Sequence, residues 1–521
     1  MLARILRIGV GVLTVGGLAF STLVPRGAQA SANGTLRVAT TAAVTTWDPA
    51  LSSSTEVEYM ANVYQGLTYA GPPGSKPLIR PQLATKWKHS KNGLTWTFSL
   101  RHGVRFHDGT LMTAKSVINS INHINKVWNN GTSWAPVKSM TAPNKYTVVF
   151  HLSYPARLDY IASAEYLSWI FGPKALTEPA SWFAAGHDDG TGPYELSNYQ
   201  PDRQVVLKAF PKYWGGWNGS HYKTIVSSII SESAVQQEMV QSGQADIAKG
   251  IPINELSSIK SNPSLRAIIG PSNFYYLLYF NTKRKPLNKV LVRQALSYAI
   301  PYQSILKVAT AGRGRQSRGP IPYGLYPHDN HLKQYTYNLA KAKALLKKAG
   351  FPHGGFNLNL TYAAENTAEA QYAPLIKESF AKLGVGVTIK SLLFNSQWAL
   401  AKGDPKSAQD LFLLLTWPSY DDDWIDLQVY YECQKTTTWN MAYYCNPTFD
   451  KMTNKAIKLE VSNPKKARLL FHQAQALLVK QAPVAWLYQD VTFFVTDKQV
   501  AGVTLNASYP FVTFYYPMHP A

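Results

Sequence analysis

Acidic residues and cysteines are scarce in this chain of 521 residues. It holds 30 Asp and Glu against 52 Lys and Arg, which gives a formal net charge of +22, and it has only two cysteines. Such an excess of positive charge could indicate nucleic-acid binding. The basic residues are nevertheless spread along the chain, so we interpret them as a solvated basic surface and expect no nucleic-acid partner.

Beyond its N-terminus the chain lacks any apolar run long enough to span a membrane. The first 30 residues differ, because Arg4 and Arg7 precede the apolar stretch 8–24, and Ala28 and Ala30 complete an A-x-A cleavage pattern. This order is typical of a secretory signal peptide over 1–30, with an uncleaved membrane anchor as the alternative. No cysteine is present there to carry a lipid, so we expect release into a periplasm.

The two cysteines, Cys433 and Cys445, lie close together in the sequence. In an exported protein such an even pair predicts a disulfide. A zinc site would need more ligands, and no histidine lies between or next to the two cysteines, so we expect no metal.

Familiar catalytic motifs are also missing. The sequence contains no G-x-S-x-G elbow, no H-E-x-x-H and no P-loop. We therefore expect a protein that is not an enzyme and has no cofactor. A secreted hydrolase is the alternative, because paired carboxylates can meet in space without a sequence signature.

The patterning that is present predicts interleaved α/β structure. Segment 94–100 alternates apolar and polar residues like a strand, and 113–124 has the pattern of a helix. Segments 357–362, 368–383 and 385–390 read as strand, helix and strand, which predicts a β-α-β unit with a right-handed crossover. The polar group Arg101, Arg105, His107 and Asp108 is interpreted as a charged surface hairpin rather than a catalytic cluster.

Several short segments occur in one order that is similar to a known family. The chain resembles the peptide/nickel-type extracellular solute-binding proteins of ABC importers in segments 81–84 (PQLA), 92–98 (NGLTWTF), 100–109 (LRHGVRFHDG), 113–117 (TAKSV), 190–195 (GTGPYE), 292–300 (VRQALSYAI), 340–350 (AKAKALLKKAG) and 446–450 (NPTFD). Most of these segments have structural interpretations, such as turns at glycines and a packed strand face. They indicate the fold and say little about the ligand.

The resemblance implies a two-lobed periplasmic-binding-protein-like fold with a ligand cleft between the lobes. The first lobe would comprise 31–77, 183–270 and 495–521, with an extra α+β domain at 78–182. The second lobe would be 271–494, and the crossings near 270 and 494 would act as hinges. A bound ligand would stabilise the closed state. The implied partners are a small ligand and an ABC import permease, and we expect a monomer.

The segment 411–424 is the most informative for the ligand, because a buried strand leads into the loop WPSYDDDW. Ligands tend to bind at the carboxyl ends of strands in α/β sheets. The resemblance implies an acid a few positions after Trp417 that pairs with a peptide's amino group. Here that position is Ser419 or Tyr420, and Asp421 is the nearest acid. The candidate ligand-binding residues are Trp47, Tyr276, Asn281, Trp417, Tyr420, Asp421, Asp423, Trp424 and Trp439.

The chemistry of this loop leaves several ligands open. The carboxylates at 421–423 could hold an ammonium or guanidinium group, or accept hydrogen bonds from sugar hydroxyls between the tryptophan rings. Calcium binding and helix capping are further possibilities for them. Family frequency favours a peptide, followed by an oligosaccharide and then a nickel or other metal chelate.

Overall fold

One continuous sheet runs through the whole molecule. The computed structural model describes residues 34–128, 133–418, 420 and 424–521, so the predicted signal peptide 1–30 lies outside it. Within this part of the chain the main sheet has 11 strands. Their order is β15 (Val385–Leu392), β14 (Phe356–Ala363), β16 (Leu411–Thr416), β12 (Leu265–Phe280), β17 (Val484–Asp497), β11 (Ile247–Ala248), β1 (Thr35–Thr40), β10 (Thr224–Ile229), β9 (Gln204–Ala209) and β8 (Tyr194–Gln200), with β13 (Arg315–Gln316) beside β17.

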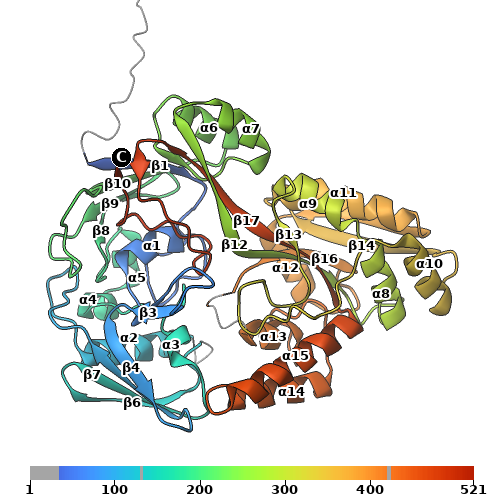
Figure 1. The fold of residues 1–521 in the computed structure, drawn as a ribbon, viewed down its shortest axis with the longest axis horizontal. Helices are drawn as coiled ribbons and strands as arrows, with labels where there is room; N and C mark the ends of the chain where they lie inside the picture. The colour runs from blue at the N-terminus through green and yellow to red at the C-terminus, as the bar shows by residue number, and fades with distance from the viewer. Residues whose placement is uncertain (1–33, 129–132, 419, 421–423) are drawn as a thin grey trace, which may run out of the picture.

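The strands β12 and β17 join two lobes (Figure 1). One end of each strand lies among the strands of the first lobe (β1 and β8–β11), and the other end lies among those of the second lobe (β14–β16). Their antiparallel pairing changes register between Pro271 and Tyr275, and again between Tyr276 and Leu277. A break in the hydrogen-bond ladder between two rigid lobes is a natural place for bending, close to one of the predicted hinges.

The second lobe contains the predicted β-α-β unit. Strands β14 and β15 pair in parallel, and α11 (Thr367–Ala381) connects them, which confirms this prediction. Asn366 caps α11 by accepting a hydrogen bond from the backbone N–H of Glu369. The lobe's other helices are α8 (Val290–Ala299), α9 (Tyr302–Thr310), α10 (Leu339–Lys348), α12 (Phe394–Lys402), α13 (Trp424–Tyr431), α14 (Pro447–Leu459) and α15 (Pro464–Gln481).

The first lobe has a core of its own around β1, β8–β11 and the C-terminal segment. Its buried residues include Trp47, Tyr194 and Tyr515. The other elements of this region are α1 (Val57–Val63), β2 (Thr68–Ala70), β3 (Ile79–Pro81), α4 (Pro173–Thr177), α5 (Ala180–Ala184), α6 (Ser233–Gln241), a 3-10 turn (Ile253–Glu255), α7 (Leu256–Ser261), β18 (Val500–Ala501) and β19 (His519–Pro520).

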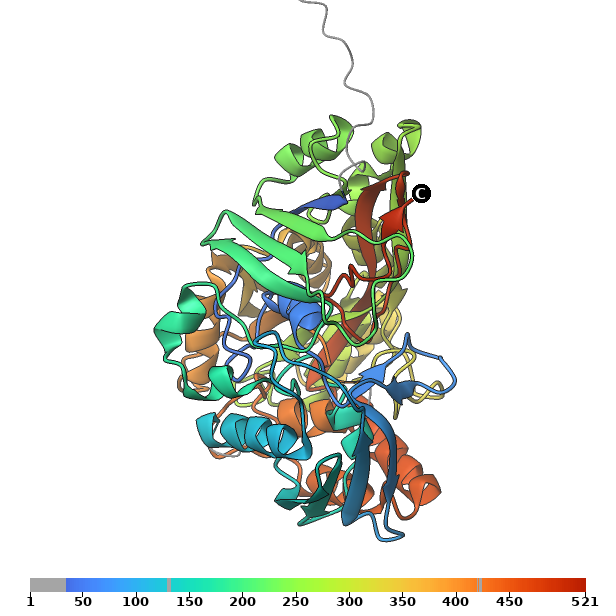
Figure 2. The same ribbon diagram turned by 90° about the vertical axis from the view of Figure 1, so that its left-hand side faces the viewer.

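A separate four-stranded antiparallel sheet carries the extra α+β unit. Its order is β4 (Ala84–His89), β5 (Thr95–Leu100), β7 (Thr147–Leu152) and β6 (Val137–Asn144), and it is accompanied by α2 (Ala114–Val127) and α3 (Leu158–Ile161). Trp96, Phe98 and Leu100 face its core, as the alternation predicted. Figure 2 shows this unit at the end of the molecule opposite the C-terminus. The two-lobed α/β class is therefore confirmed, while the exact domain limits stay a prediction.

The predicted disulfide is present between Cys433 and Cys445. It links the segment after α13 to the segment before α14, and Asn440 of this loop donates from its side chain to the carbonyls of Glu432, just before the loop, and Tyr444. Among the described residues, no helix combines the length and apolar character needed to cross a bilayer.

Replacing both cysteines by serine should lower the free energy of unfolding by about 3 kcal/mol, because the open chain of the unfolded state regains the entropy that the closed loop removes. Thermal unfolding of the variant and of the dithiothreitol-treated protein measures the effect. An unchanged melting temperature under reduction would contradict the prediction.

The group around His107 differs from the expected surface hairpin. The ring of His107 is buried, with Nδ1 bonded to the carboxylate of Asp188 and Nε2 3.1 Å from the carbonyl oxygen of Gly192. The partners are 81 and 85 residues away in the sequence, so local patterning could not reveal them. The pair ties the extra unit to the segment that enters β8.

Stability should therefore depend on pH through His107. Burial lowers the pKa of His107, but the charge of Asp188 and the hydrogen bond to it raise it more, so the net direction is upward. A raised pKa means that the stabilisation is fully present below the ordinary histidine pKa of about 6.5 and is lost as pH rises through the folded value. We expect His107→Gln to destabilise the protein by about 2 kcal/mol at pH 6 and by less at pH 9. Equal losses at both pH values in urea unfolding would contradict this account.

Candidate ligand-binding cleft

Three aromatic rings from different parts of the chain meet between the lobes. Trp417 of the second lobe lies 4.9 Å, centroid to centroid, from Phe511 of the C-terminal segment, and 5.9 Å from Phe274 of β12. Phe274 and Phe511 are 4.7 Å apart. We call these three residues the aromatic clamp. Because its members come from both lobes and the connecting strand, the clamp exists only when the lobes are together.

The lobes also touch at sites away from the clamp. A Cβ atom on Gly93 of the extra unit would lie 2.8 Å from the side chain of Val461, which follows α14 in the second lobe. A Cβ atom on Gly324 would lie 3.4 Å from Pro73 of the first lobe. With contacts at these places and at the clamp, the structure shows the lobes closed on one another.

Strand β16 places Trp417 at the cleft. The strand is buried between β14 and β12, and Thr416, its last residue, pairs with Tyr275. Trp417 is the first residue beyond the sheet and is partly exposed. Burial raises the pKa of the Tyr166 phenol, and Trp417 is close enough to that phenol to lower its pKa in part. The Tyr166 hydroxyl donates to the carbonyl of Ser54 at 3.2 Å. The carboxyl end of β16 therefore carries an aromatic residue toward the first lobe, as expected for a ligand site in an α/β sheet.

A buried ion pair in the first lobe fixes the opposite side of the clamp. Lys249 Nζ lies 2.8 Å from the carboxylate of Glu58 and donates to the carbonyl oxygen of Phe511 at 3.0 Å. Glu58 also accepts hydrogen bonds from Thr40 and Tyr515. The segment that carries Phe511 is thus held to α1 and to the sheet of its own lobe.

The acidic loop is only partly described. Tyr420 is 3% exposed and packs in the core of the extra unit, so the loop reaches from the second lobe across to that unit. Trp424 is 5% exposed and packs in the core of the second lobe. Ser419, Asp421 and Asp423 lie outside the described residues, and their proposed ligand contacts stay predictions.

The other predicted site residues are not all brought together. Tyr276 pairs with Leu415, two residues before Trp417, and lies near the cleft. Asn281 is the first residue after β12, where its side chain donates to the carbonyls of residues 405 and 409. Trp47 is 1% exposed and packs on Tyr59 and Tyr199 in the first-lobe core. Trp439 is 43% exposed and packs on Trp398 and Tyr430. We therefore build the site from Tyr276 and Trp417.

A group of tyrosines and carboxylates next to Tyr276 was not predicted from the sequence. Tyr276 stacks on Tyr488 of β17, with ring centroids 4.5 Å apart, and both rings are roughly perpendicular to the ring of Tyr372 from α11. Glu369 of α11 accepts a hydrogen bond from the backbone N–H of Ala363. Asp490 of β17 lies near the same rings and raises the pKa of Tyr276 and Tyr488 by charge repulsion, in addition to the larger effect of burial.

Burial also shifts the two carboxylates. It raises the pKa of Glu369 to about 8 and that of Asp490 to about 7, against one opposing backbone hydrogen bond each. A sequence signal for Asp490 did exist, because it is the only acid in the otherwise apolar and polar-uncharged run 484–494. Glu369 gave no such signal, since an acid in the first turn of a helix is usually a capping residue.

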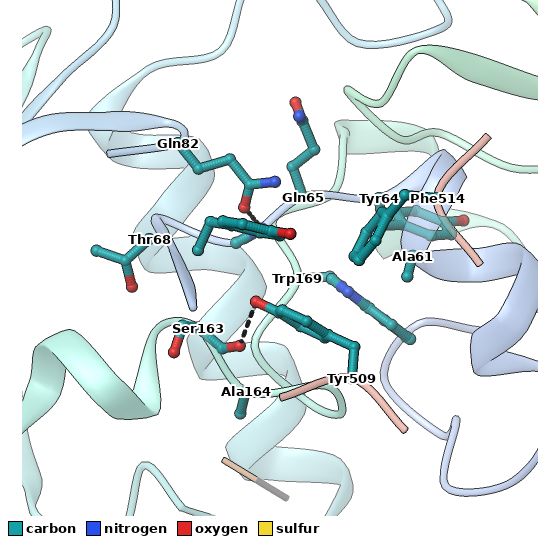
Figure 3. Close-up of a pocket in the computed structure, with 12 residues that line it drawn as sticks. Ala61, Tyr64, Gln65, Thr68, Gln82, Ser163, Ala164, Trp169, Tyr509 and Phe514 are labelled. Atoms are coloured by element: carbon teal, nitrogen blue, oxygen red, sulfur yellow. Dashed lines mark hydrogen bonds between the residues drawn. The ribbon is translucent and has the colours of Figure 1, made fainter. Parts of the chain in front are cut away.

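Two other hollows lie outside the clamp. The first, at the junction of the first lobe and the extra unit, is lined by Tyr64, Thr68, Trp169 and Tyr509, and the Tyr509 hydroxyl donates to the carbonyl of Ser163 (Figure 3). Its volume of about 20 Å³ suits a single water molecule. The second, about 490 Å³, is an open groove between the extra unit and Val461 of the second lobe. Among the described residues, no group of three or more His, Cys, Asp or Glu side chains is arranged to hold a metal ion.

A two-lobed α/β protein whose lobes are joined by two long strands and meet at the carboxyl end of a buried strand belongs to the class of periplasmic binding proteins. Comparison with known families gives the finer assignment. Residues 79–438 match the model of the bacterial extracellular solute-binding proteins, family 5. This match covers well over half of the chain, and the protein belongs to that family.

Individual relatives agree with this assignment. The chain is 28% identical over 435 residues to the probable D,D-dipeptide-binding periplasmic protein of Escherichia coli strain K12, covering 82% of each chain. It is 28% identical over 465 residues to the dipeptide-binding protein of the same strain, covering 82% of this chain and 84% of the relative. An ABC transporter-associated periplasmic binding protein from Helicobacter pylori, solved with the peptide STSA, has the same fold, with a TM-score of 0.79 at 23% identity over 93% of this chain and 98% of the other.

These findings confirm the predicted family and its extracytoplasmic location. Members of the family bind small solutes outside the cytoplasm and work with the permeases of ABC importers, and this general function holds for the present chain. The kind of solute is a separate question.

Proposed function

We propose that this protein binds short peptides between its lobes and delivers them unchanged, as a monomer, to the permease of an ABC importer. The central observation is that an aromatic clamp between the lobes lies next to a partly exposed carboxylate, Asp490, on the connecting strand β17. Rings of Trp417, Phe274 and Phe511 offer apolar faces for a side chain, while carboxylates suit the ammonium group that every free peptide carries.

The relatives support a peptide over the other solutes. Two relatives that share 28% of their residues with this chain over more than four fifths of its length are named for dipeptides. A third, 27% identical, is named for glutathione, itself a tripeptide derivative, and comes from Salmonella typhimurium. We therefore place peptides ahead of the oligosaccharides and metal chelates that a loop rich in aromatic and acidic residues could also bind.

Thermal unfolding in the presence of a ligand panel tests the proposal. The panel comprises mixed dipeptides, mixed tripeptides, maltotriose, and nickel with histidine. A ligand at a hundred times its dissociation constant adds about 2.7 kcal/mol to the stability of the folded state. We expect the peptide pools alone to raise the melting temperature. A shift with the saccharide or the nickel complex and none with peptides would contradict the proposal.

The same samples distinguish binding from hydrolysis. After overnight incubation, mass spectrometry of the denatured mixture should recover the bound peptides intact. Recovery of shorter fragments or free amino acids, absent from a protein-free control, would indicate an enzyme instead.

A further inference from the structure

Asp490 lies at an irregular point of the hinge ladder. Pro271 pairs with Val491 and Tyr275 pairs with Gln489, so residues 272–274 of β12 together face the single residue Asp490. Phe274 of this widened stretch is a member of the aromatic clamp. Asp490 is partly exposed although the strand before it is buried. It therefore lies next to the clamp, on the strand that connects the two lobes.

The surroundings of Asp490 supply no cation. Its Oδ1 accepts a hydrogen bond from the backbone N–H of Val491 at 2.7 Å, and among the described residues no Lys, Arg or His forms an ion pair with it. Arg315 of β13 pairs with the neighbouring Gln489, but its guanidinium lies 3.4 Å above the ring of Tyr323. The titratable groups on which the charge of Asp490 acts are Tyr276 of β12, Tyr372 of α11 and Tyr488 of β17, and the carboxylate of Glu369 acts on the same three tyrosines.

A second polar group at this place also lacks a partner. Tyr372 is completely buried, and its hydroxyl has no hydrogen-bond partner within the described part of the chain. The charges of Glu369 and Asp490 act on this hydroxyl, which places it in the same group. Buried polar atoms are normally satisfied, so the hydroxyl of Tyr372 and the carboxylate of Asp490, which has no cationic partner, are two polar groups that would be stabilised by a polar partner from a ligand.

The charge of the group is small at neutral pH. Burial raises the pKa of Glu369 to about 8, so this side chain is mostly neutral at pH 7. Burial raises the pKa of Asp490 to about 7, so this residue is the one that ionises when a positive charge approaches. With Asp490 ionised and Glu369 neutral, the site carries one negative charge and can therefore bind one cationic group.

We propose that Asp490 is a specificity-determining residue that receives one cationic group of the bound peptide, an ammonium or a guanidinium, beside the hydroxyl of Tyr372. The inference rests on the proposed function, because it names the ligand group that the peptide site selects. This role explains why a protein with a net charge of +22 has a carboxylate without a cationic partner on its hinge strand. The basic surface repels a cationic ligand, and a negative charge at the site offsets that repulsion.

Isothermal titration with four peptides tests the proposal. Ala-Lys and Ala-norleucine differ in a cationic side chain, and Ala-Ala and N-acetyl-Ala-Ala differ in the α-ammonium group. Each is measured on the wild type, on Asp490→Asn, and on Asp497→Asn, a matched control on the same strand whose carboxylate accepts a hydrogen bond from Gln499. For one of the two peptide pairs, we expect the peptide without the cation to bind the wild type and Asp497→Asn about tenfold more weakly, or worse, than its cationic partner. Asp490→Asn should bind the two peptides of that pair equally well.

The outcomes separate the possible failures. The proposal is supported if Asp490→Asn no longer prefers the cationic peptide of one pair. The pair that loses this preference shows whether the cation is the α-ammonium or the side-chain ammonium. An undiminished preference for the cation in Asp490→Asn overturns the proposal and leaves the proposed peptide function standing. If the wild type binds none of the four peptides, both the peptide function and this inference are wrong.

A measurement on the wild type alone guards against a variant that does not fold. Titration of the preferred cationic peptide at pH 7 in two buffers of different ionisation enthalpy reports the protons exchanged on binding. Because Asp490 must ionise to receive the cation, we expect release of about half a proton and tighter binding at pH 8 than at pH 6. Binding without proton release and without pH dependence would overturn the proposal.

Discussion

Replacing Arg293 by alanine should lower the free energy of unfolding of the second lobe by about 3–5 kcal/mol. Arg293 belongs to α8 and is 3% exposed. Its guanidinium donates to the carbonyl oxygens of Gln481 and Ala482 at the end of α15, and to that of Leu287. The last carbonyls of a helix have no partner within the helix and carry partial negative charge. The guanidinium therefore both donates hydrogen bonds to these carbonyls and places a positive charge beside them.

The size of this effect follows from what the substitution leaves behind. Burial lowers the pKa of Arg293 to about 10, with no carboxylate to oppose it, yet the group stays charged at neutral pH. Alanine would leave three carbonyl oxygens without this donor, those of Leu287 and Ala482 in buried contacts and that of Gln481 in a partly buried one, and a cavity where the side chain had been. Lysine would keep the charge and lose the planar fork, so Arg293→Lys should show a smaller loss.

Urea unfolding, followed by intrinsic tryptophan fluorescence, measures these losses in the free energy of unfolding. Arg468→Ala is the matched control, because Arg468 is exposed on α15 and should change stability by less than about 0.5 kcal/mol. A loss below about 1 kcal/mol for Arg293→Ala would contradict the role of this side chain.

Replacing Trp417 by alanine should weaken peptide binding about 30- to 100-fold while leaving both lobes folded. The indole contacts Phe511 of the first lobe and Phe274 of the hinge strand, so its loss removes contacts made only in the closed state. A ligand must then supply more of the free energy of closure itself, and its apparent affinity falls.

The matched control is Trp182→Ala, because Trp182 packs on Phe183 and His187 within the first lobe and takes no part in the clamp. This variant should bind peptide as the wild type does. Equal affinities of Trp417→Ala and Trp182→Ala in titration calorimetry would show that the clamp does not stabilise the closed state.

The sequence was most informative where structure depends on local patterning. Alternation identified the strand with Trp96 and Phe98, and the order of strand, helix and strand patterns identified the β-α-β unit that ends at β15. The pair Cys433 and Cys445 was recognised because the export signal and the short spacing both favour a disulfide. In these cases the residues that decide the structure are close together in the chain.

The candidate site was harder to predict because it is assembled from distant segments. Trp417 was recognised at the end of a buried strand, but its contact with Phe511 joins residues that have no common sequence pattern. Trp47 carries an aromatic ring near the expected cleft, yet packing against Tyr59 and Tyr199 buries it. Asp490 depends on a register change in a long strand pair, which only the three-dimensional ladder reveals.

Native mass spectrometry of the protein purified without added ligand tests the central claim most directly. If the closed lobes hold peptides, the folded protein should carry additional masses of a few hundred daltons that disappear on denaturation, and the released molecules should fragment as intact peptides. A co-purified saccharide or metal complex, or a protein that remains free of ligand after incubation with a peptide mixture, would contradict the account.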